Sequence, residues 1–310
     1  MSILAFVVVV LWLSPAYAAD WFPSKYGAED RLGAINNLSA QAVVEAAGLI
    51  TTGKVYSLAM PTGPKTPAFG PRNYQIRTDR IFVGDSPTVG ANKLQGFDDL
   101  VISWLGVGTQ IDGFAHVGAD GRHYNGVPTE EVIRPDGAIQ YGIHTLPPIV
   151  GRGVLLDMAA AAGVAQLPER TVFESAELRA AVQRQGTEVR TGDVVLLHTG
   201  WLSVADEDGE RFLAKPPGIG LDGATWLADQ DVVAVGADTW TIEGWPTNDT
   251  LPDHFLPVHD LLLTKRGVYI LENIKTAELA ADQVYEFFFM LAAPRLVGAV
   301  QSPVHPVAIR

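Results

Sequence analysis

The chain has 310 residues, is 47% hydrophobic and 18% charged, and carries a formal net charge of −13 with no cysteine. An acidic balance without clustered Lys and Arg excludes a nucleic-acid-binding surface. The lack of cysteine excludes disulfides, thiolate metal sites and a cysteine nucleophile.

The first 18 residues have the pattern of a secretory leader. Residues 3–13 form an apolar run too short to span a bilayer, and Ala16-Tyr17-Ala18 is a small-x-small cleavage pattern. No Lys or Arg precedes the run, so an uncleaved anchor or a mis-assigned start codon on a cytosolic enzyme stays open. We expect residues 1–18 to be a signal peptide, the protein to be periplasmic or secreted, and no membrane span to remain after cleavage.

The next segments alternate between helix, strand and loop signals. Ser39 is a plausible N-cap for a helix over 40–47, and a strand is expected over 54–58. The Pro- and Gly-rich segment 61–71 predicts a mobile lid. Residues 100–105 read as a buried strand.

The remaining elements predict an α/β fold. Short apolar runs indicate strands at 154–158, 194–197, 232–235, 268–271 and 296–300, and amphipathic or helical stretches lie at 173–184, 224–229 and 279–287. Strands mixed irregularly with helices favour the α/β class. No break in composition marks a boundary, so residues 19–310 are expected to form a single domain.

A polar group stands out in otherwise apolar surroundings. Gln110, Asp112 and His116 fall at i, i+2 and i+6, and on an extended segment these side chains share one face. Amide, carboxylate and imidazole together suit a divalent cation or general acid–base chemistry. A buried hydrogen-bond network would give the same three residues.

A second group lies downstream. His254 and His259 are five residues apart, and Glu272 closes the apolar run 268–271. A buried Glu must be paired or bound to a metal. A Glu at the solvated end of a strand would give the same pattern.

Several motifs, taken in order, resemble the cyclase-like metal-dependent hydrolases, the family of bacterial kynurenine formamidase and isatin hydrolase. They are Trp21-Phe22-Pro23-Ser24, Leu32-Gly33-Ala34-Ile35-Asn36, Gly108-Thr109-Gln110-Ile111-Asp112, Leu197-His198-Thr199-Gly200-Trp201, Gly236-Ala237-Asp238-Thr239, His259-Asp260-Leu261-Leu262, Ile270-Leu271-Glu272-Asn273 and Ser302-Pro303-Val304-His305-Pro306. The resemblance covers essentially everything after the leader and implies the family's swivelling β/β/α fold.

The resemblance also implies roles for particular residues. Asp112, His259 and Glu272 would be metal ligands, and His116 would donate and accept the proton. His259 is preferred to His254 because its Leu-Leu context matches the family.

Two departures limit the metal site. The resembling formamidases carry histidine ligands at the positions of Gly106 and Gln110. Glycine offers no ligand, and the Gln110 carbonyl is weaker than imidazole. A binuclear zinc site is therefore not expected. We expect one divalent ion per subunit, Mn²⁺ or Zn²⁺, held by Asp112, His259 and Glu272 with Gln110 or water. The Gly-Thr-Gln-x-Asp-Gly form resembles one branch of the family.

These parts predict hydrolysis of a small amide, formamide, cyclic imide or lactone by metal-activated water. Trp21, Phe69, Phe114, Trp240 and Trp245 could line an apolar pocket, with Arg72 binding a substrate carboxylate. Core packing of the aromatics and a surface position for Arg72 are the ordinary alternatives. Glu243 could support the site or act as an extra acid.

Two other functions fit the same residues. Loss of two ligands could leave an exported, non-catalytic protein that binds a small molecule. A metal-dependent isomerase or dehydratase could use His116 as its base. In each case the expected partner is a small molecule and not nucleic acid. By resemblance, the chain is expected to form a homodimer or homotetramer.

Overall fold

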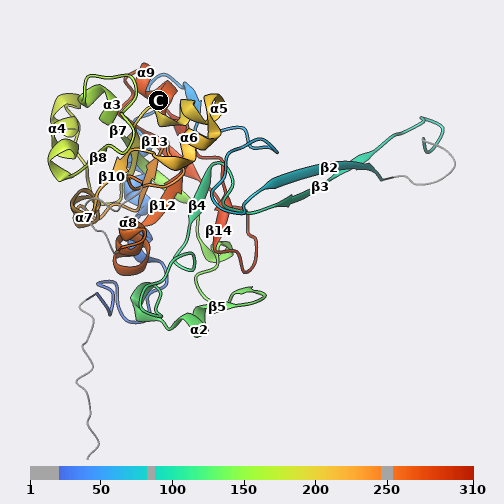
Figure 1. The fold of residues 1–310 in the computed structure, drawn as a ribbon, viewed down its shortest axis with the longest axis horizontal. Helices are drawn as coiled ribbons and strands as arrows, with labels where there is room; N and C mark the ends of the chain where they lie inside the picture. The colour runs from blue at the N-terminus through green and yellow to red at the C-terminus, as the bar shows by residue number, and fades with distance from the viewer. Residues whose placement is uncertain (1–20, 82–87, 246–253) are drawn as a thin grey trace, which may run out of the picture.

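The computed structural model describes residues 21–81, 88–245 and 254–310. The expected leader therefore lies outside the described residues. Among those that are described, no helix has the length and apolarity needed to cross a membrane. The described chain forms a body of packed strands and helices from which one long β-ribbon projects (Figure 1).

A curled sheet occupies the centre of the body. Its described strands, in spatial order, are β1 (Val55–Ser57), β15 (Val307–Ile309), β13 (Glu286–Leu291), β7 (Ile149–Asp157), β9 (Val194–His198), β11 (Ala234–Ala237), β12 (Tyr269–Glu272), β4 (Gln110–Asp112) and β14 (Gln301–Pro303). The four strands β7, β9, β11 and β12 are mutually parallel. All residues of β9 are buried, as expected for parallel strands covered on both faces.

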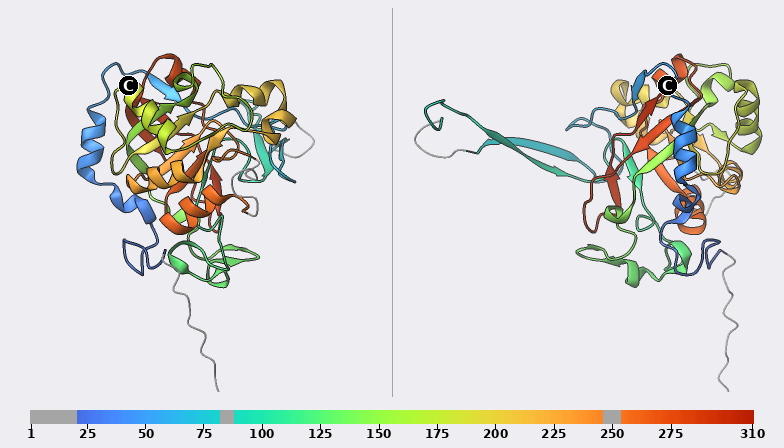
Figure 2. Two further views of the ribbon diagram at one scale, coloured as in Figure 1. Left: turned by 60° about the vertical axis from the view of Figure 1, so that its left-hand side comes forward. Right: turned by 180° about the vertical axis from the view of Figure 1, so that it is seen from behind.

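Helices pack around this sheet. They are α1 (Ala40–Ala47), α2 (Thr129–Val132), α3 (Met158–Ala161), α4 (Ser175–Gln185), α5 (Val204–Glu207), α6 (Gly209–Ala214), α7 (Leu221–Asp229), α8 (Pro257–His259) and α9 (Ala277–Ala281). Helix α1 packs on β7 and β13, and α4 packs on β7 and α7. Helix α8 continues directly into a π-helix at Asp260–Arg266. Helix α2 is the exception, because it contacts the small strand β5 (Ile133–Arg134) and lies apart from the sheet. Figure 2 shows the helices from two further sides.

Smaller two-stranded units complete the fold. They are β2 (Tyr74–Arg80) with β3 (Phe97–Ser103), β5 (Ile133–Arg134) with β6 (Gly137–Ala138), and β8 (Val172–Phe173) with β10 (Gly218–Ile219). The β2–β3 pair is the projecting ribbon, and we call it the arm. The other two units stay with the body.

Local sequence signals account for much of this arrangement. The Ser39 hydroxyl accepts a hydrogen bond from the Ala42 N–H at 3.1 Å, so the predicted N-cap and helix 40–47 are confirmed. Helix α4 begins with a reciprocal capping box between Glu174 and Glu177 and ends at Gly186 in the left-handed conformation.

Three predicted elements were wrong. Residues 100–105 are not a buried strand, because β3 ends at Ser103 and lies exposed in the arm. The helix predicted over 279–287 ends at Ala281, and its second half enters strand β13. The strand predicted over 296–300 begins only at Gln301. Short apolar runs carry no signal that separates a core strand from an exposed one or from a helix.

Candidate metal centre and adjoining pocket

Strand register brings the predicted polar residues together. Strand β4 pairs with β12 on one side and β14 on the other, so that Gln110 lies opposite Glu272 and Asp112 opposite Gln301. Because side chains alternate along strands, these four point to one face of the sheet. The intervening Ile111, Leu271 and Ser302 point to the other face and are fully buried.

Hydrogen bonds to two other segments of the chain fix the Gly108-Thr109 turn that precedes β4. The Thr109 hydroxyl donates to the Asn273 carbonyl at 2.6 Å and accepts from the Met60 N–H at 2.9 Å. Gly108 has φ +77, and a Cβ there would lie 2.0 Å from the Thr62 hydroxyl. Only glycine fits this turn, and the turn places Gln110 and Asp112 against the end of β12.

A buried group of three side chains can hold a cation. Asp112, His259 and Glu272 each offer a ligand atom, and these atoms lie within 4.8 Å of one another. His259 Nε2 is 3.2 Å from Glu272 Oε1 and 3.8 Å from Asp112 Oδ2. Asp112 Oδ2 is buried and has no hydrogen-bond partner among the described residues. Two carboxylates and an imidazole, with one oxygen left unpaired, fit a divalent cation.

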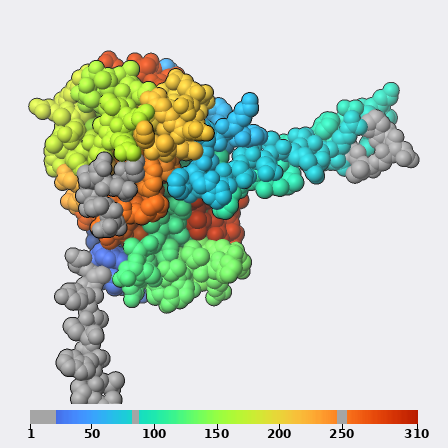
Figure 3. Space-filling view, in the orientation of Figure 1, coloured from blue at the N-terminus to red at the C-terminus, as the bar shows by residue number. Residues whose placement is uncertain are grey.

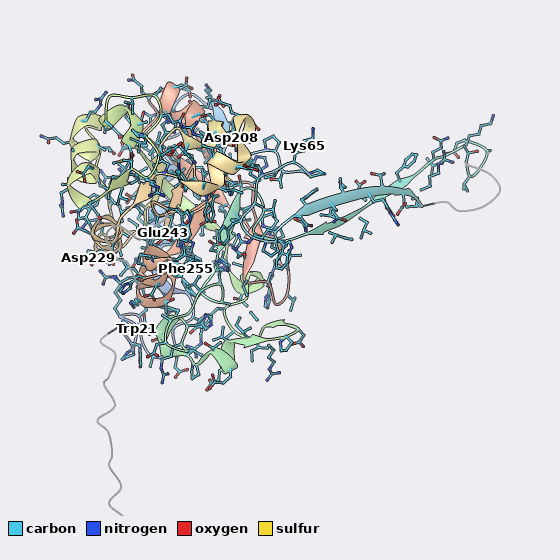
Figure 4. The ribbon with its side chains drawn as sticks, viewed as in Figure 1. Trp21, Lys65, Asp208, Asp229, Glu243 and Phe255 are labelled. Atoms are coloured by element: carbon cyan, nitrogen blue, oxygen red, sulfur yellow. The ribbon has the colours of Figure 1, made fainter. Side chains whose placement is uncertain are left out.

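Glu243 orients the histidine of this group. The Nδ1–H of His259 donates to Glu243 Oε1, and Glu243 Oε2 accepts from the Val258 N–H at 2.7 Å. The hydrogen bond at Nδ1 leaves Nε2 facing the two carboxylates, the arrangement common to metal-binding histidines. Figure 4 shows Glu243 inside the body, near the helix that carries His259. Glu243, which the sequence suggested as a residue that could support the site, therefore contacts His259 directly.

Charges within the group shift its protonation equilibria. Burial, together with the nearby Asp112 charge, raises the pKa of Glu272 to about 7. Burial lowers the pKa of His259, but the carboxylates of Glu243 and Glu272 outweigh this effect and hold the pKa well above its usual value. Without a cation, the group therefore retains protons that a bound metal would displace.

Gln110 lies beside these three side chains, but its side-chain nitrogen, and not its oxygen, faces the two carboxylates. Its Nε2 donates to Glu272 Oε2 at 2.7 Å and lies 3.4 Å from Asp112 Oδ1. In this orientation the amide links the two carboxylates, and its oxygen is buried without a partner among the described residues. Its role as a metal ligand stays a prediction.

His116 stands beside the group, not on its strand. Strand β4 ends at Asp112, and a turn closed by the His116 N–H on the Gly113 carbonyl carries the ring back, so His116 does not share an extended face with Asp112. Its ring centre is 6.4 Å from that of His259. Burial lowers the pKa of His116 and keeps the ring neutral near pH 7.

Gln301 was missed by sequence reasoning. Its Nε2 donates to Asp112 Oδ1 at 2.7 Å and lies 3.2 Å from His116 Nε2, so it bridges the predicted ligand and the predicted base. It immediately precedes the motif Ser302-Pro303-Val304-His305-Pro306, which was the available signal.

The space at Gly106 is filled by other side chains. A Cβ at this position would lie 2.7 Å from Arg72 Nη1 and 2.9 Å from Gln301 Oε1. Arg72 Nη1 also donates to the Gly106 carbonyl at 3.2 Å. A guanidinium and an amide thus fill the space beside Gly106, and the number of ions in the site stays a prediction.

A pocket of about 200 Å³ opens onto the group. His116, His259, Glu272 and Arg72 line its polar side. Phe69, Trp240, Trp245 and Phe255 line the other side. Phe69 stacks on Trp240 with ring centres 4.8 Å apart, and Trp245 meets Phe255 edge to face at 5.4 Å. The pocket can bind a planar or apolar group next to a polar one.

Two predicted substrate-binding residues lie elsewhere. Phe114 is buried in the core and packs on Tyr124 and Tyr269, with ring centres 4.6 and 4.3 Å away. Trp21 lines a separate pocket where the described chain begins, away from Glu243 (Figure 4). Their placement does not support substrate contact within one chain. His254 is exposed, whereas His259 is buried in the group.

Comparisons with known proteins support the same fold and family. The family model described as a putative cyclase matches residues 56–244. A crystal structure described as a novel cyclase is 32% identical, covering 92% of this chain and 98% of its own, with a TM-score of 0.82. No curated protein matches the chain.

More distant structures share the fold. Isatin hydrolase A from Ralstonia solanacearum is 19% identical, with a TM-score of 0.59, covering 88% of this chain and 98% of its own. A predicted metal-dependent hydrolase from Bacillus stearothermophilus is 19% identical, with a TM-score of 0.51, covering 83% of this chain and 98% of its own. The predicted cyclase-like hydrolase fold is confirmed.

Proposed function

Since the chain belongs to the putative cyclase family, we propose that it is a metal-dependent hydrolase that cleaves a C–N or C–O bond of a small amide, formamide, cyclic imide or lactone. The observation that carries this proposal is the buried Asp112, His259 and Glu272 group, which opens onto a pocket also lined by His116.

The ligand set suits one ion per subunit, Mn²⁺ or Zn²⁺. Two carboxylates and one imidazole serve either metal. A bound divalent ion lowers the pKa of its water to about 7 in favourable sites and polarises a carbonyl. Arg72 fills the space at Gly106 with a fixed positive charge, which favours a single ion over two.

The protein's own residues supply the proton transfer. His116 is neutral near pH 7 because burial lowers its pKa, so its ring can accept a proton from water. The same ring can then return the proton to the leaving nitrogen or oxygen. Gln301 donates to Asp112 and also lies beside His116 Nε2, which holds the base at a constant position relative to the ligands.

The pocket lining favours a substrate with a flat apolar part. Phe69, Trp240, Trp245 and Phe255 provide ring faces and edges, and Arg72 can pair with a carboxylate or a carbonyl oxygen. Products would be a carboxylate together with an amine or alcohol.

The test combines metal content with isotope incorporation. We would purify the chain without chelator, measure bound Mn and Zn, and screen amides and lactones in H₂¹⁸O. The expected result is about one ion per subunit and ¹⁸O in the carboxylate product. Asp112→Ala should lose both, whereas Asp136→Asn, an exposed carboxylate control, should keep both.

Two results would contradict the proposal. Turnover without ¹⁸O uptake would indicate an isomerase or dehydratase. Failure to bind either metal when both are offered would instead support a non-catalytic binding protein.

A further inference from the structure

A second pocket lies between the first described residues and the helical segment that follows His259. Its volume is about 490 Å³, larger than that of the pocket beside the metal group, and among the described residues the two pockets share no lining residue. In the space-filling view the blue N-terminal residues lie below the orange part of the body that carries this segment (Figure 3). The volume is in the range of sites that bind a small organic molecule.

Positive charge is concentrated on the lining of this second pocket. Its charged residues are Lys25, Asp231, Lys265 and Arg266, three cations against one carboxylate. The whole chain carries −13, so the pocket lining has the opposite sign to the chain as a whole. Burial, and then the Arg266 charge, lower the pKa of Lys25, so these two cations lie close enough to repel each other. An anion bound between them would remove that repulsion.

The ion pairs of these cations leave donors free for a ligand. Each cation has one carboxylate partner among the described residues, and the pairs are Lys25–Asp231, Lys265–Asp260 and Arg266–Asp229. An ammonium has three N–H donors and a guanidinium has five, so one partner does not use them all. The three cationic side chains are between 36% and 54% exposed, and a ligand can therefore reach them.

Aromatic rings lie beside the cations. Trp21 and Tyr26 both line the pocket, and Lys25 Nζ lies 5.0 Å from the centre of the Tyr26 ring. A flat, apolar ligand can pack against aromatic rings face to face or edge to face. The lining thus combines groups that attract an anion with groups that attract a ring.

The segment that supplies two of the cations has an uncommon geometry. Asp260–Arg266 is a π-helix, and it begins directly after His259. Turns of π-helix are rare and frequently lie at functional sites. The start of this segment adjoins His259 of the metal group, and its end carries Lys265 and Arg266 of the second pocket.

We propose that the second pocket binds an aromatic carboxylate. The ring of the ligand packs against Trp21 and Tyr26, and its carboxylate accepts hydrogen bonds from Lys265 and Arg266. Asp231 lies in the same lining and repels the second negative charge of a phosphate, so a singly charged anion is favoured. Binding here requires no turnover, so the proposal can fail while the hydrolase assignment stands, and the reverse.

The first experiment is an NMR titration of the full chain, labelled with ¹⁵N at its tryptophan indoles, with naphthoate. Trp21→Phe identifies the indole signal of Trp21. We expect that signal to move with a Kd of about a millimolar or lower. The signal of Trp201, which is buried away from this pocket, should stay in place. A Trp21 signal that does not respond would overturn the proposal.

A charge variant tests the role of the cations. Lys265→Gln with Arg266→Gln should weaken naphthoate binding about tenfold or more, because hydrogen bonds from charged donors are lost. Arg179→Gln with Arg184→Gln removes the same charge from exposed positions on α4 and should leave binding unchanged. Circular dichroism checks that both variants fold. Equal weakening in the two variants, or none in either, would contradict the proposal.

Two other ligands test the chemical class. Naphthalenemethanol has the same ring system without the charge, and should bind about tenfold more weakly than naphthoate or less well still. Inorganic phosphate has the charge without the ring, and should move the Trp21 signal little. If either ligand matches naphthoate, the aromatic carboxylate is the wrong class.

A last comparison separates the second pocket from the metal group, where a carboxylate can also bind. Asp112→Asn and Arg72→Gln alter only the pocket beside the metal group. Both variants should show the wild-type response of Trp21 to naphthoate. Loss of that response in either variant would place the ligand beside the metal group and overturn the proposal.

Discussion

The metal group and the aromatic side of the pocket are neighbours that are built differently. Asp112 and Glu272 stand on paired strands whose register fixes their separation, and both are fully or nearly fully buried. Phe69 comes from the loop before the arm and Phe255 from the segment before α8, and both are exposed. The three possible metal ligands are thus held by paired strands and a buried helix, whereas Phe69 and Phe255 lie on connecting segments, which tolerate change.

The largest effect is expected from breaking the metal group itself. Asp112→Asn removes a charged ligand and should lower metal content from one ion per subunit to a trace. Losing the ion should cost about 4 kcal/mol of transition-state stabilisation, roughly a thousandfold in rate. Elemental analysis and initial rates check this. Full activity with no bound metal would contradict the proposal of a metal-dependent hydrolase.

A variant of His116 distinguishes a role in proton transfer from a role in metal binding. His116→Gln should lower kcat about a hundredfold or more because general acid–base catalysis is lost, with metal content unchanged. Steady-state kinetics and elemental analysis are both needed. If the variant loses its metal instead, His116 is a ligand and not the base.

A variant of Glu243 tests whether the hydrogen bond to His259 Nδ1 contributes to metal affinity. Glu243→Gln keeps the shape of the side chain but weakens the hydrogen bond at Nδ1, and should lower metal affinity about 10–100-fold. Competition with a fluorescent chelator measures the affinity. Saturating metal should restore kcat; a defect that persists would mean that Glu243 acts in the reaction.

Metal affinity should also fall with acidity. Burial and the Asp112 charge raise the pKa of Glu272 to about 7, so below pH 7 this carboxyl carries a proton that the metal must displace. His259, with its raised pKa, must lose a proton as well. Apparent affinity should fall at least about tenfold from pH 7 to pH 6. Titration calorimetry in two buffers of different ionisation enthalpy would count the protons released, and a count of zero would contradict the expectation.

The smallest effect is expected on the aromatic side. Phe69→Ala removes a ring stacked on Trp240 and should raise KM several-fold, in keeping with about 0.5–1.5 kcal/mol for an aromatic pair. Metal content and kcat should not change. An equal loss in kcat would show that the loop also positions the reacting groups.

The sequence alone identifies site residues that belong to a local motif. It does not identify those that reach the site only because strands far apart in the chain pair with each other. Asp112, His259 and Glu272 were named, the last two with the help of resemblance, and they converge in one group. Gln301 was not named, because it reaches Asp112 only through the pairing of β14 with β4. Phe114 lies in the core and Trp21 lines another pocket, because an aromatic residue beside a motif packs in the core or in another pocket as readily as in the site.

The pairing of β4 with β12 has a consequence for biosynthesis. Gln110 and Asp112 leave the ribosome some 160 residues before Glu272, and β14, which covers the other side of β4, comes later still. The cation site therefore does not exist on the nascent chain until nearly all of it has been made. An ion held by this site would be taken up where the chain finishes folding, and the metals available in that compartment would decide which ion it is.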